Sequence, residues 1–567
     1  MTSLGSLEAA REVVSGLLAG GVRRVVVCPG SRSAPLAYAL AEAEGRGLLE
    51  LVIRIDERAG GFTALGAALS SGRPTAVLTT SGTAVGNLLP AVMEANHAEV
   101  PLVVLSADRP AELHGTGANQ TTEQLDLFGE HVRFATSIAA GESPSSAVRT
   151  ALSAASGLLP GVPSGPVQVN VCFREPLVPA GEWEPATAGW QQPPTEGFAY
   201  RRPAVAALGG LPPRRTVVLA GHAAGPLAEA FAAAHGLPLL AEPSSNARFG
   251  SHAVGPYRVL LDGHPGDGIE RVVLFGRPTL SRPVTALLAR EGVETALYHP
   301  RPAAWFEEGR RRERLVEDLD ELSHFAGRGA EGWLDTWLLA GASAQEAIDR
   351  LLAGSPLSGP KLAQLVWQHA RGQLMLGSSN GIRDVDLAAP PPAEPGARVF
   401  ANRGLSGIDG TISSATGLWL GNRLETTLFL GDLTFLHDAG GLLLGVGEAE
   451  PSLRIVVLND AGGAIFGLLE HGRVGGDEAR PGAAAAVERL FGTPHKADLR
   501  ALAAAYGIRH TAVRTTAEAA SALAAPRTGG REIIEARVDR SGLRGLHERL
   551  RSAVTESVSP QHRYGYR

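Results

Sequence analysis

Short apolar runs alternate with Ala- and Leu-rich stretches along most of the chain. Runs such as VRRVVVCPG (22–30) and PLVVLSADRP (101–110) are rich in β-branched residues and end in Gly, Pro, Asp or Ser. Runs of this kind predict buried strands, and the longer Ala- and Leu-rich stretches predict helices. Because strands that alternate with helices form parallel sheets, the predicted fold class is α/β with open parallel sheets.

The predicted strands fall into three consecutive blocks. A chain of 567 residues is too long for one hydrophobic core. A segment rich in Pro, Gly and Trp, PAGEWEPATAGWQQPPTEG (179–197), reads as a linker after the first block, and a helical stretch near 340–353 precedes the third. We therefore predict three consecutive α/β domains, over residues 1–185, 195–335 and 350–567.

Two strands of the third block end in polar residues. The run LFLGD ends at Asp432, and IVVLN ends at Asn459, 27 residues later. That spacing is the length of one strand–helix–strand unit, which would bring the two strand ends side by side, where open α/β sheets bind ligands. A carboxylate, an amide oxygen and backbone carbonyls suit Mg²⁺. A helix cap and a turn residue are the alternative, and spacing alone does not decide between them.

Two features of the first block could also contact a ligand. Glu57 follows the run LELVIRID, and Gly60 and Gly61 would let a flat ligand or another backbone approach the helix behind it. The Ser-Gly-Thr turn at 81–83 precedes a helix and could hold an anion. The alternatives are a surface acid at a helix start and an ordinary capped helix.

Taken together, these features resemble the thiamine diphosphate enzyme family. The resemblance implies that Glu57 contacts the aminopyrimidine of thiamine diphosphate, and that the segment from Asp432 to Asn459 binds Mg²⁺, or Mn²⁺ in its place, together with the diphosphate. Leu433 stands where many members have glycine, and Asp460 stands where they have a second asparagine. Because a carboxylate would repel a diphosphate, we expect Asp460 to point away from it.

The resemblance also implies which residues surround the cofactor and the metal. Gly462 and Gly463 would let backbone amides approach the diphosphate. Ile465 and Phe466 would form an apolar wall, with ordinary core packing as an equal alternative. The expected cofactor-binding residues are Glu57, Ser81, Gly82, Thr83, Gly431, Leu433, Gly462, Gly463, Ile465 and Phe466, and the expected metal ligands are Asp432, Asn459 and Ala461.

Longer motifs narrow the resemblance to one enzyme of menaquinone biosynthesis within that family. The motifs are CPGSRSAPL (28–36), ADRPAEL (107–113), GANQTTEQ (117–124) and NRGLSGIDGTISSATG (402–417). In this enzyme a leucine after Gly-Asp is usual. The implied activity is a transferase reaction, in which 2-oxoglutarate loses CO₂ and is joined to isochorismate. Another thiamine diphosphate-dependent decarboxylase or carboligase, such as acetolactate synthase, is the alternative, but it would leave these motifs unexplained.

Arginines recur at the predicted strand ends. The two implied substrates carry four carboxylates, and the planar guanidinium binds carboxylate with two parallel hydrogen bonds. A surface salt bridge is the alternative for any one arginine. By resemblance the substrate-binding residues include Arg32, Arg109, Asn119, Gln120, Ser379, Arg383 and Arg403. Arg282, which could reach in from the middle domain, and the apolar Ile465 and Phe466 are expected to join them. The residues expected to act in catalysis are Glu57, Arg32, Gln120 and Ser31, which shares the turn of Arg32.

Composition excludes several other classes. A net charge of −6 argues against a nucleic-acid or membrane-surface protein. Neither Lys361 nor Lys496 lies in a P-loop motif, and no strand carries a dinucleotide-binding glycine fingerprint. Two cysteines, with no signal peptide and no apolar run long enough to span a bilayer, indicate a cytoplasmic protein without a membrane span.

Glu57 and Asp432 fall in different predicted domains. In the family that the chain resembles, the N-terminal domain of one subunit faces the C-terminal domain of its partner. The resemblance therefore implies a homodimer as the minimum active unit, with a homotetramer as a common further assembly.

Overall fold

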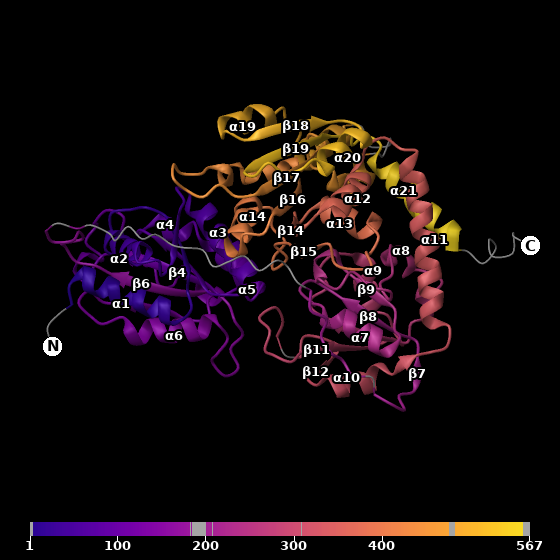
Figure 1. The fold of residues 1–567 in the computed structure, drawn as a ribbon, viewed down its shortest axis with the longest axis horizontal. Helices are drawn as coiled ribbons and strands as arrows, with labels where there is room; N and C mark the ends of the chain where they lie inside the picture. The colour runs from indigo at the N-terminus through magenta and orange to yellow at the C-terminus, as the bar shows by residue number, and fades with distance from the viewer. Residues whose placement is uncertain are drawn as a thin grey trace, which may run out of the picture.

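The fold consists of three parallel sheets that follow one another along the chain (Figure 1). The computed structural model describes residues 4–181, 183, 200–206, 208–307, 309–475 and 482–558. Most of the expected linker over 179–197 lies outside these residues. The alternation of strands and helices confirms the predicted α/β class.

The first sheet is buried on both faces, which explains why its strands are almost continuously apolar. Helices α1, α2 and α6 cover one face, and α3 and α5 cover the other. Its strand order is β2 (Glu50–Ile53), β1 (Arg24–Val27), β3 (Thr75–Thr79), β4 (Leu102–Asp108), β6 (Val167–Cys172) and β5 (Ala135–Ile138). Its helices are α1 (Ser6–Ala19), α2 (Ala34–Gly45), α3 (Glu57–Ser71), α4 (Thr83–Gly86), α5 (Leu89–His97) and α6 (Ser145–Ala155).

The second sheet lies below the third in Figure 1, with α11 along its outer side. Its strand order is β12 (Arg314–Val316), β11 (Glu294–Tyr298), β10 (Arg271–Phe275), β8 (Thr216–Ala220) and β9 (Leu239–Ala241), and β7 (Pro213–Arg214) pairs separately with β13 (Arg328–Gly329). Its helices are α7 (Leu227–His235), α8 (Tyr257–Leu260), α9 (Arg282–Leu288), α10 (Leu319–Ala326) and α11 (Trp333–Ala353). The C-terminal helix returns to this region and packs on α11.

The third sheet repeats the pattern of the first, with helices on both faces. Its strand order is β15 (Ala397–Phe400), β14 (Gly372–Leu376), β16 (Thr426–Gly431), β17 (Leu453–Asn459), β19 (Arg531–Arg537) and β18 (Arg509–Val513). Its helices are α12 (Gly359–His369), α13 (Asn380–Ala388), α14 (Thr411–Asn422), α15 (Asp432–His437), α16 (Ile465–Leu468), α17 (Glu470–Gly475), α18 (Ala483–Val487), α19 (Leu499–Ala505), α20 (Thr516–Ala524) and α21 (Leu543–Val558).

Helices α3 and α14 join the first and third sheets by packing backbone against backbone. A Cβ atom on Gly66 would lie 2.1 Å from the carbonyl oxygen of Ser414, and one on Gly417 would lie 2.1 Å from that of Thr63. The small residues of α3 therefore serve, at least in part, the close approach of another helix. Gly60 itself faces Cys28 on strand β1's side of the helix.

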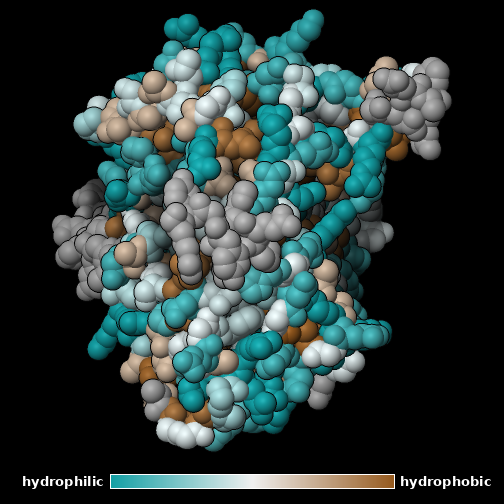
Figure 2. Space-filling view, turned by 90° about the vertical axis from the view of Figure 1, so that its right-hand side faces the viewer, coloured by the Kyte–Doolittle hydropathy of each residue, from teal (hydrophilic) through white to brown (hydrophobic). Residues whose placement is uncertain are grey.

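The strands of the three sheets span residues 24–172, 216–316 and 372–537. The domain boundaries at 1–185, 195–335 and 350–567 stay predictions. Among the described residues, no helix is both long and apolar enough to cross a membrane. On the face shown in Figure 2, hydrophilic residues cover most of the coloured surface, interrupted by smaller apolar areas.

Candidate active site

Asp432 and Asn459 lie next to each other at the carboxyl ends of two paired strands. Gly431 of β16 is in register with Leu458 of β17, so that the residues after them begin adjacent turns. Asp432 is buried, with 2% of its surface exposed. Burial raises the pKa of its carboxyl group, while a hydrogen bond from His495 opposes the shift. The expected strand–helix–strand geometry is thus present.

Both side chains are held by hydrogen bonds. Asp432 Oδ1 accepts from the Leu433 N–H (2.7 Å), and Oδ2 accepts from the Gly462 N–H (2.8 Å) and His495 Nε2 (2.9 Å). Asn459 Oδ1 accepts from the Ala461 N–H (3.0 Å). The contact from Ala461 to Asn459 is that of a turn residue, as the alternative interpretation expects, but Asp432 does not cap α15, whose N-cap is Gly431. These contacts also leave a buried carboxylate and an amide oxygen side by side, which is a donor set that suits a hard cation.

Gly462 and Gly463 allow a neighbouring loop to approach closely. A Cβ atom on Gly462 would lie 2.2 Å from the Gly492 carbonyl oxygen, and the Gly463 N–H donates to that oxygen (2.7 Å). The Gly462 N–H is already bonded to Asp432. Both amide N–H groups therefore already donate hydrogen bonds within the chain, whether or not a diphosphate is bound.

The residues after this loop are apolar. Ile465 and Phe466 begin α16 and are half-buried. The Phe466 ring lies 5.6 Å from that of Phe491 and 6.0 Å from that of His471. The two residues thus belong to a small aromatic cluster beside the strand ends, with part of their surface left open.

Asp460 faces a cation. Its Oδ1 lies 3.9 Å from Arg540 Nη1, and only 10% of its side-chain surface is exposed. Burial, followed by the charge of Asp432, raises the pKa of Asp460 to about 7. The arginine explains how a second acid is tolerated at this strand end.

Glu57 begins α3, but it does not cap the helix. The cap is Asp56, whose Oδ1 accepts from the Arg58 and Ala59 N–H groups. Glu57 is half-buried, and its Oε2 accepts a long hydrogen bond from Asn87 Nδ2 (3.3 Å). A half-buried acid beside a strand end, with the cap supplied by its neighbour, has its carboxylate available for a ligand.

The Ser-Gly-Thr turn is tied to the segment around residue 120. Ser81 Oγ donates to the Gln120 carbonyl oxygen (2.8 Å), and Gln120 Nε2 donates to that of Ser81 (2.9 Å). The Gly82 N–H is bonded to Gln124 Oε1 (2.8 Å). Thr83 starts α4, which is only four residues long. One amide of the expected anion cradle is therefore already occupied.

Two arginines lie close together in the first domain. Arg32 is buried, and its Nη1 donates to the Phe173 carbonyl oxygen (2.9 Å). Burial and then the charge of Arg109 lower its pKa. Arg109 donates to the backbone and side-chain oxygens of Asn119, both at 2.8 Å. Ser31 is exposed beside Arg32. The structure brings these predicted residues together at the ends of β1 and β4.

Arg403 and Arg383 are positioned in the third domain. Arg403 is 2% exposed, and its Nε donates to Thr279 Oγ1 (2.9 Å). Its Nη1 is buried and makes no hydrogen bond to the described residues. Arg383 Nη1 donates to the Ser379 carbonyl oxygen (2.8 Å). The free Nη1 of Arg403 is a donor that a substrate carboxylate could use.

Arg282 differs from the other predicted arginines. It forms an exposed ion pair with Glu470, with Nη1 2.6 Å from Oε1, and 75% of its side-chain surface is open to solvent. Among the described residues, no hydrogen bond or ion pair joins the Glu57, Arg32 or Arg109 side chains to Asp432 or Asn459, although Arg58 Nη2, next to Glu57, donates to the His437 carbonyl oxygen at the end of α15 (3.0 Å). The predicted site residues therefore form two separate clusters within one chain.

Comparison with known proteins identifies the family. Residues 7–127 match the family described as "Thiamine pyrophosphate enzyme, N-terminal TPP binding domain". The 2-succinyl-5-enolpyruvyl-6-hydroxy-3-cyclohexene-1-carboxylate synthase of Arthrobacter sp. (strain FB24) is 66% identical over 98% of this chain and 93% of its own length. The chain belongs to this synthase family. Synthases with the same name from Renibacterium salmoninarum and Nocardioides sp. (strain ATCC BAA-499 / JS614) are 57% and 45% identical, over 99% and 96% of the chain.

Membership in the synthase family confirms the predicted enzyme class and thiamine diphosphate, also called thiamine pyrophosphate, as the cofactor. It supports the synthase interpretation over acetolactate synthase. Among the described residues, no group of three or more His, Cys, Asp or Glu side chains is placed to hold a metal ion. The predicted magnesium site needs no such group, because it uses one carboxylate, one amide and one backbone carbonyl.

The sequence alone did not single out three of the polar residues at this site. His495 contacts Asp432, and Glu535 accepts a hydrogen bond from Asn459 Nδ2 (2.6 Å). His510 contacts Glu535 in turn (2.9 Å). Glu535 did leave a signal, since it is an acid inside the otherwise apolar run IIEA. His495 lies in a loop without any comparable pattern.

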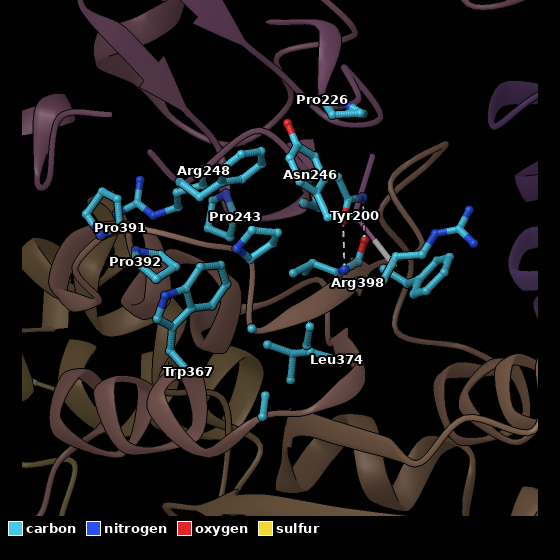
Figure 3. Close-up of a pocket in the computed structure, with 18 of the residues that line it drawn as sticks. Tyr200, Pro226, Pro243, Asn246, Arg248, Trp367, Leu374, Pro391, Pro392 and Arg398 are labelled. Atoms are coloured by element: carbon cyan, nitrogen blue, oxygen red, sulfur yellow. Dashed lines mark hydrogen bonds between the residues drawn. The ribbon is translucent and has the colours of Figure 1, made fainter. Parts of the chain in front are cut away.

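A cavity of about 710 Å³ lies away from these residues, between the second and third sheets (Figure 3). Trp367, Leu374 and Pro392 line it from the third domain, and Tyr200 and Asn246 line it from the second. None of the predicted site residues contributes to its wall. The cavity is therefore separate from the candidate active site.

Proposed function

We propose that the protein removes CO₂ from 2-oxoglutarate and joins the remaining four-carbon unit to isochorismate, forming 2-succinyl-5-enolpyruvyl-6-hydroxy-3-cyclohexene-1-carboxylate. The observation that carries this proposal is the 66% identity, over nearly the full chain, to a synthase with that name. The arrangement of arginines in both clusters agrees with it, because the two substrates bring four carboxylates to the site.

The cofactor is held from both clusters in this proposal. Asp432, Asn459 and the carbonyl of Ala461 would hold Mg²⁺, or Mn²⁺ in its place, and the metal would hold the diphosphate. When bound, thiamine diphosphate supplies the electron sink that loss of CO₂ requires. Glu57 would bond to the aminopyrimidine and hold a proton there. The half-open faces of Ile465 and Phe466 would exclude water from the ring system.

Arginines orient the substrates. Arg403 has a buried Nη1 with no described partner, and a buried donor without a partner is costly unless a ligand satisfies it. Arg32 and Arg109 place two positive charges at the ends of β1 and β4, with Asn119 and Gln120 beside them. These residues would bind the carboxylates and fix the position of the reacting carbons, which are roles of positioning and charge stabilisation.

The complete site would need two chains. Within one chain, no described hydrogen bond or ion pair joins Glu57 itself to Asp432 or Asn459. Ile55, next to Glu57's helix, is 72% exposed, and Val446 is fully exposed. A twofold dimer would bring the first domain of one chain to the third domain of its partner, with a tetramer as a further assembly. The protein would act in the cytoplasm.

The test is an assay with defined substrates. Purified protein with thiamine diphosphate and Mg²⁺ is incubated with 2-oxoglutarate and isochorismate, and CO₂ and the coupled product are followed by mass spectrometry. We expect equal amounts of both, and no acetolactate when pyruvate replaces both substrates. Acetolactate formation from pyruvate, without turnover of isochorismate, would overturn the proposal.

A further inference from the structure

We infer that Glu535 and His495 are positioning residues that orient the two side-chain metal ligands, Asn459 and Asp432. The inference rests on the proposed metal site and extends it to residues that do not touch the metal. Each ligand is bonded on one side to a backbone N–H and on the other to one of these two residues. The oxygens of Asn459 and Asp432 that face the metal would therefore already be oriented before the metal binds.

The orientation of the Asn459 amide follows from its two partners. Its Nδ2 donates to Glu535 Oε1 (2.6 Å), and its Oδ1 accepts from the Ala461 N–H (3.0 Å). A carboxylate only accepts hydrogen bonds and a backbone N–H only donates, so the amide cannot be turned over without losing both contacts. The oxygen therefore faces the turn that carries Ala461, where the metal is proposed.

Glu535 is itself held rigidly. Arg537 bonds both of its oxygens, with Nε 2.9 Å from Oε1 and Nη2 3.0 Å from Oε2, and His510 Nε2 lies 2.9 Å from Oε2. Only 1% of the Glu535 side chain is exposed. Glu535 lies on β19, which pairs with β17, so the support comes from the neighbouring strand of the sheet.

His495 plays the matching part for Asp432. The Ala497 N–H donates to His495 Nδ1 (3.2 Å), which makes Nδ1 the acceptor and places the proton on Nε2. Nε2 then donates to Asp432 Oδ2 (2.9 Å), which also accepts from the Gly462 N–H. With Oδ2 bonded twice, the carboxylate plane is fixed and Oδ1, which accepts only from the Leu433 N–H, keeps a lone pair for a cation.

Partners of this kind commonly matter for metal affinity. Residues that bond a metal ligand fix its orientation, and their loss typically weakens metal binding about 10- to 100-fold. Here two such residues act on two ligands, Glu535 from the neighbouring strand β19 and His495 from a loop. Removing either residue should therefore weaken metal binding, although every metal ligand is still present.

The test measures Mn²⁺ binding to the full chain in the presence of thiamine diphosphate, by the electron paramagnetic resonance signal of free Mn²⁺. His495→Phe keeps a ring but loses the donor, whereas His495→Gln keeps an N–H donor. Glu535→Met loses the acceptor, whereas Glu535→Gln keeps an oxygen. We expect Kd to rise about tenfold or more in the first variant of each pair, and to stay within about threefold in the second.

Glu532→Met is the matched control for Glu535. Glu532 lies at the other end of β19 and pairs with Arg454 and Arg509, so its loss removes a partly buried ion-paired glutamate far from Asn459. We expect its Kd to match that of the wild type.

The possible outcomes separate the inference from the proposal beneath it. Wild-type protein that binds no Mn²⁺ would overturn both. If His495→Phe and Glu535→Met bind Mn²⁺ as tightly as the wild type does, the inference alone is overturned. Since His495 is in a loop and 16% of its side chain is exposed, His495→Phe is expected to fold, as a circular dichroism spectrum would check.

Discussion

Glu57 is the residue on which the proposed chemistry depends most. Its neighbour Asp56 caps α3, so Glu57 is not needed to start the helix. Its described polar contact is one long hydrogen bond from Asn87. A side chain that makes so few polar contacts within the protein, yet is half-buried at a strand end, is suited to contact a ligand.

Glu57→Gln should therefore abolish most activity and leave the fold intact. Loss of a residue that holds a proton in the reaction typically slows turnover about 100-fold or more. Glu44→Gln is the matched control. Glu44 is also half-buried, and it accepts a hydrogen bond from the Leu51 N–H of β2, the strand that precedes Glu57. Near-normal turnover by Glu57→Gln, with unchanged circular dichroism, would contradict the assignment.

The position of Asp432 and Asn459 at neighbouring strand ends could be predicted from the sequence, whereas their roles as ligands stay predictions. Asp432 and Asn459 were found because each ends an apolar strand, and the register of β16 and β17 then places them together. Arg282 could not be evaluated in this way, because whether a surface arginine faces a ligand or an acid such as Glu470 depends on packing. His495 was missed because its contact with Asp432 depends on how its loop folds back.

At the scale of elements, apolar runs identified the central strands of all three sheets. Of the strands at the sheet edges, β2, β9 and β15 were predicted, whereas β5, β12 and β18 were missed. β12 and β18 are mostly exposed or half-buried, and β18 reads RHTAV, which lacks a continuous apolar run. An edge strand is buried on fewer sides than a central one, so its sequence carries a weaker pattern.

The contact between α3 and α14 gives a stability prediction. Gly66→Ala would place a Cβ atom 2.1 Å from the Ser414 carbonyl oxygen, so the two helices would have to separate. We expect a loss of about 1–3 kcal/mol in the free energy of unfolding, measured by denaturant titration. Gly86→Ala is the control, because a Cβ atom at Gly86 would meet nothing within 4 Å. Equal stability of Gly66→Ala and wild type would contradict this packing.

Glu242, which follows β9, gives a pH prediction. Burial, with a smaller contribution from Asp386, raises its pKa to about 8, although Arg403 opposes the shift. Because the folded-state pKa lies above the unfolded value, this group stabilises the fold fully below the unfolded pKa. That stabilisation is lost as pH rises through about 8.

Glu242→Gln should remove this part of the pH dependence. Between pH 6 and 9 the free energy of unfolding of the wild type should fall more steeply than that of the variant, by at most about 1.4 kcal/mol per pH unit for one proton. Comparing the two slopes cancels other groups that titrate in the same window, such as Asp384, whose pKa burial raises to about 7. Parallel slopes would contradict a raised pKa at Glu242.

At the scale of the whole molecule, the candidate residues form two half-sites. The first sheet carries Glu57 and an arginine pair, and the third carries Asp432 and Asn459. Within one chain α3 packs on α14, and Arg58 of α3 bonds the His437 carbonyl of α15, but no described hydrogen bond or ion pair joins Glu57 to Asp432 or Asn459. A second chain would complete both sites at once, which is the central claim of the proposed function.

Complementation between two inactive variants tests that claim most directly. Glu57→Gln and Asp432→Asn chains are co-expressed with different tags, and turnover of 2-oxoglutarate with isochorismate is measured. If each site uses one residue from each chain, every mixed dimer has one intact site, and a random mixture should recover about a quarter of wild-type activity. A mixture as inactive as its two parents would mean that Glu57 and Asp432 act within one chain, and would contradict the account.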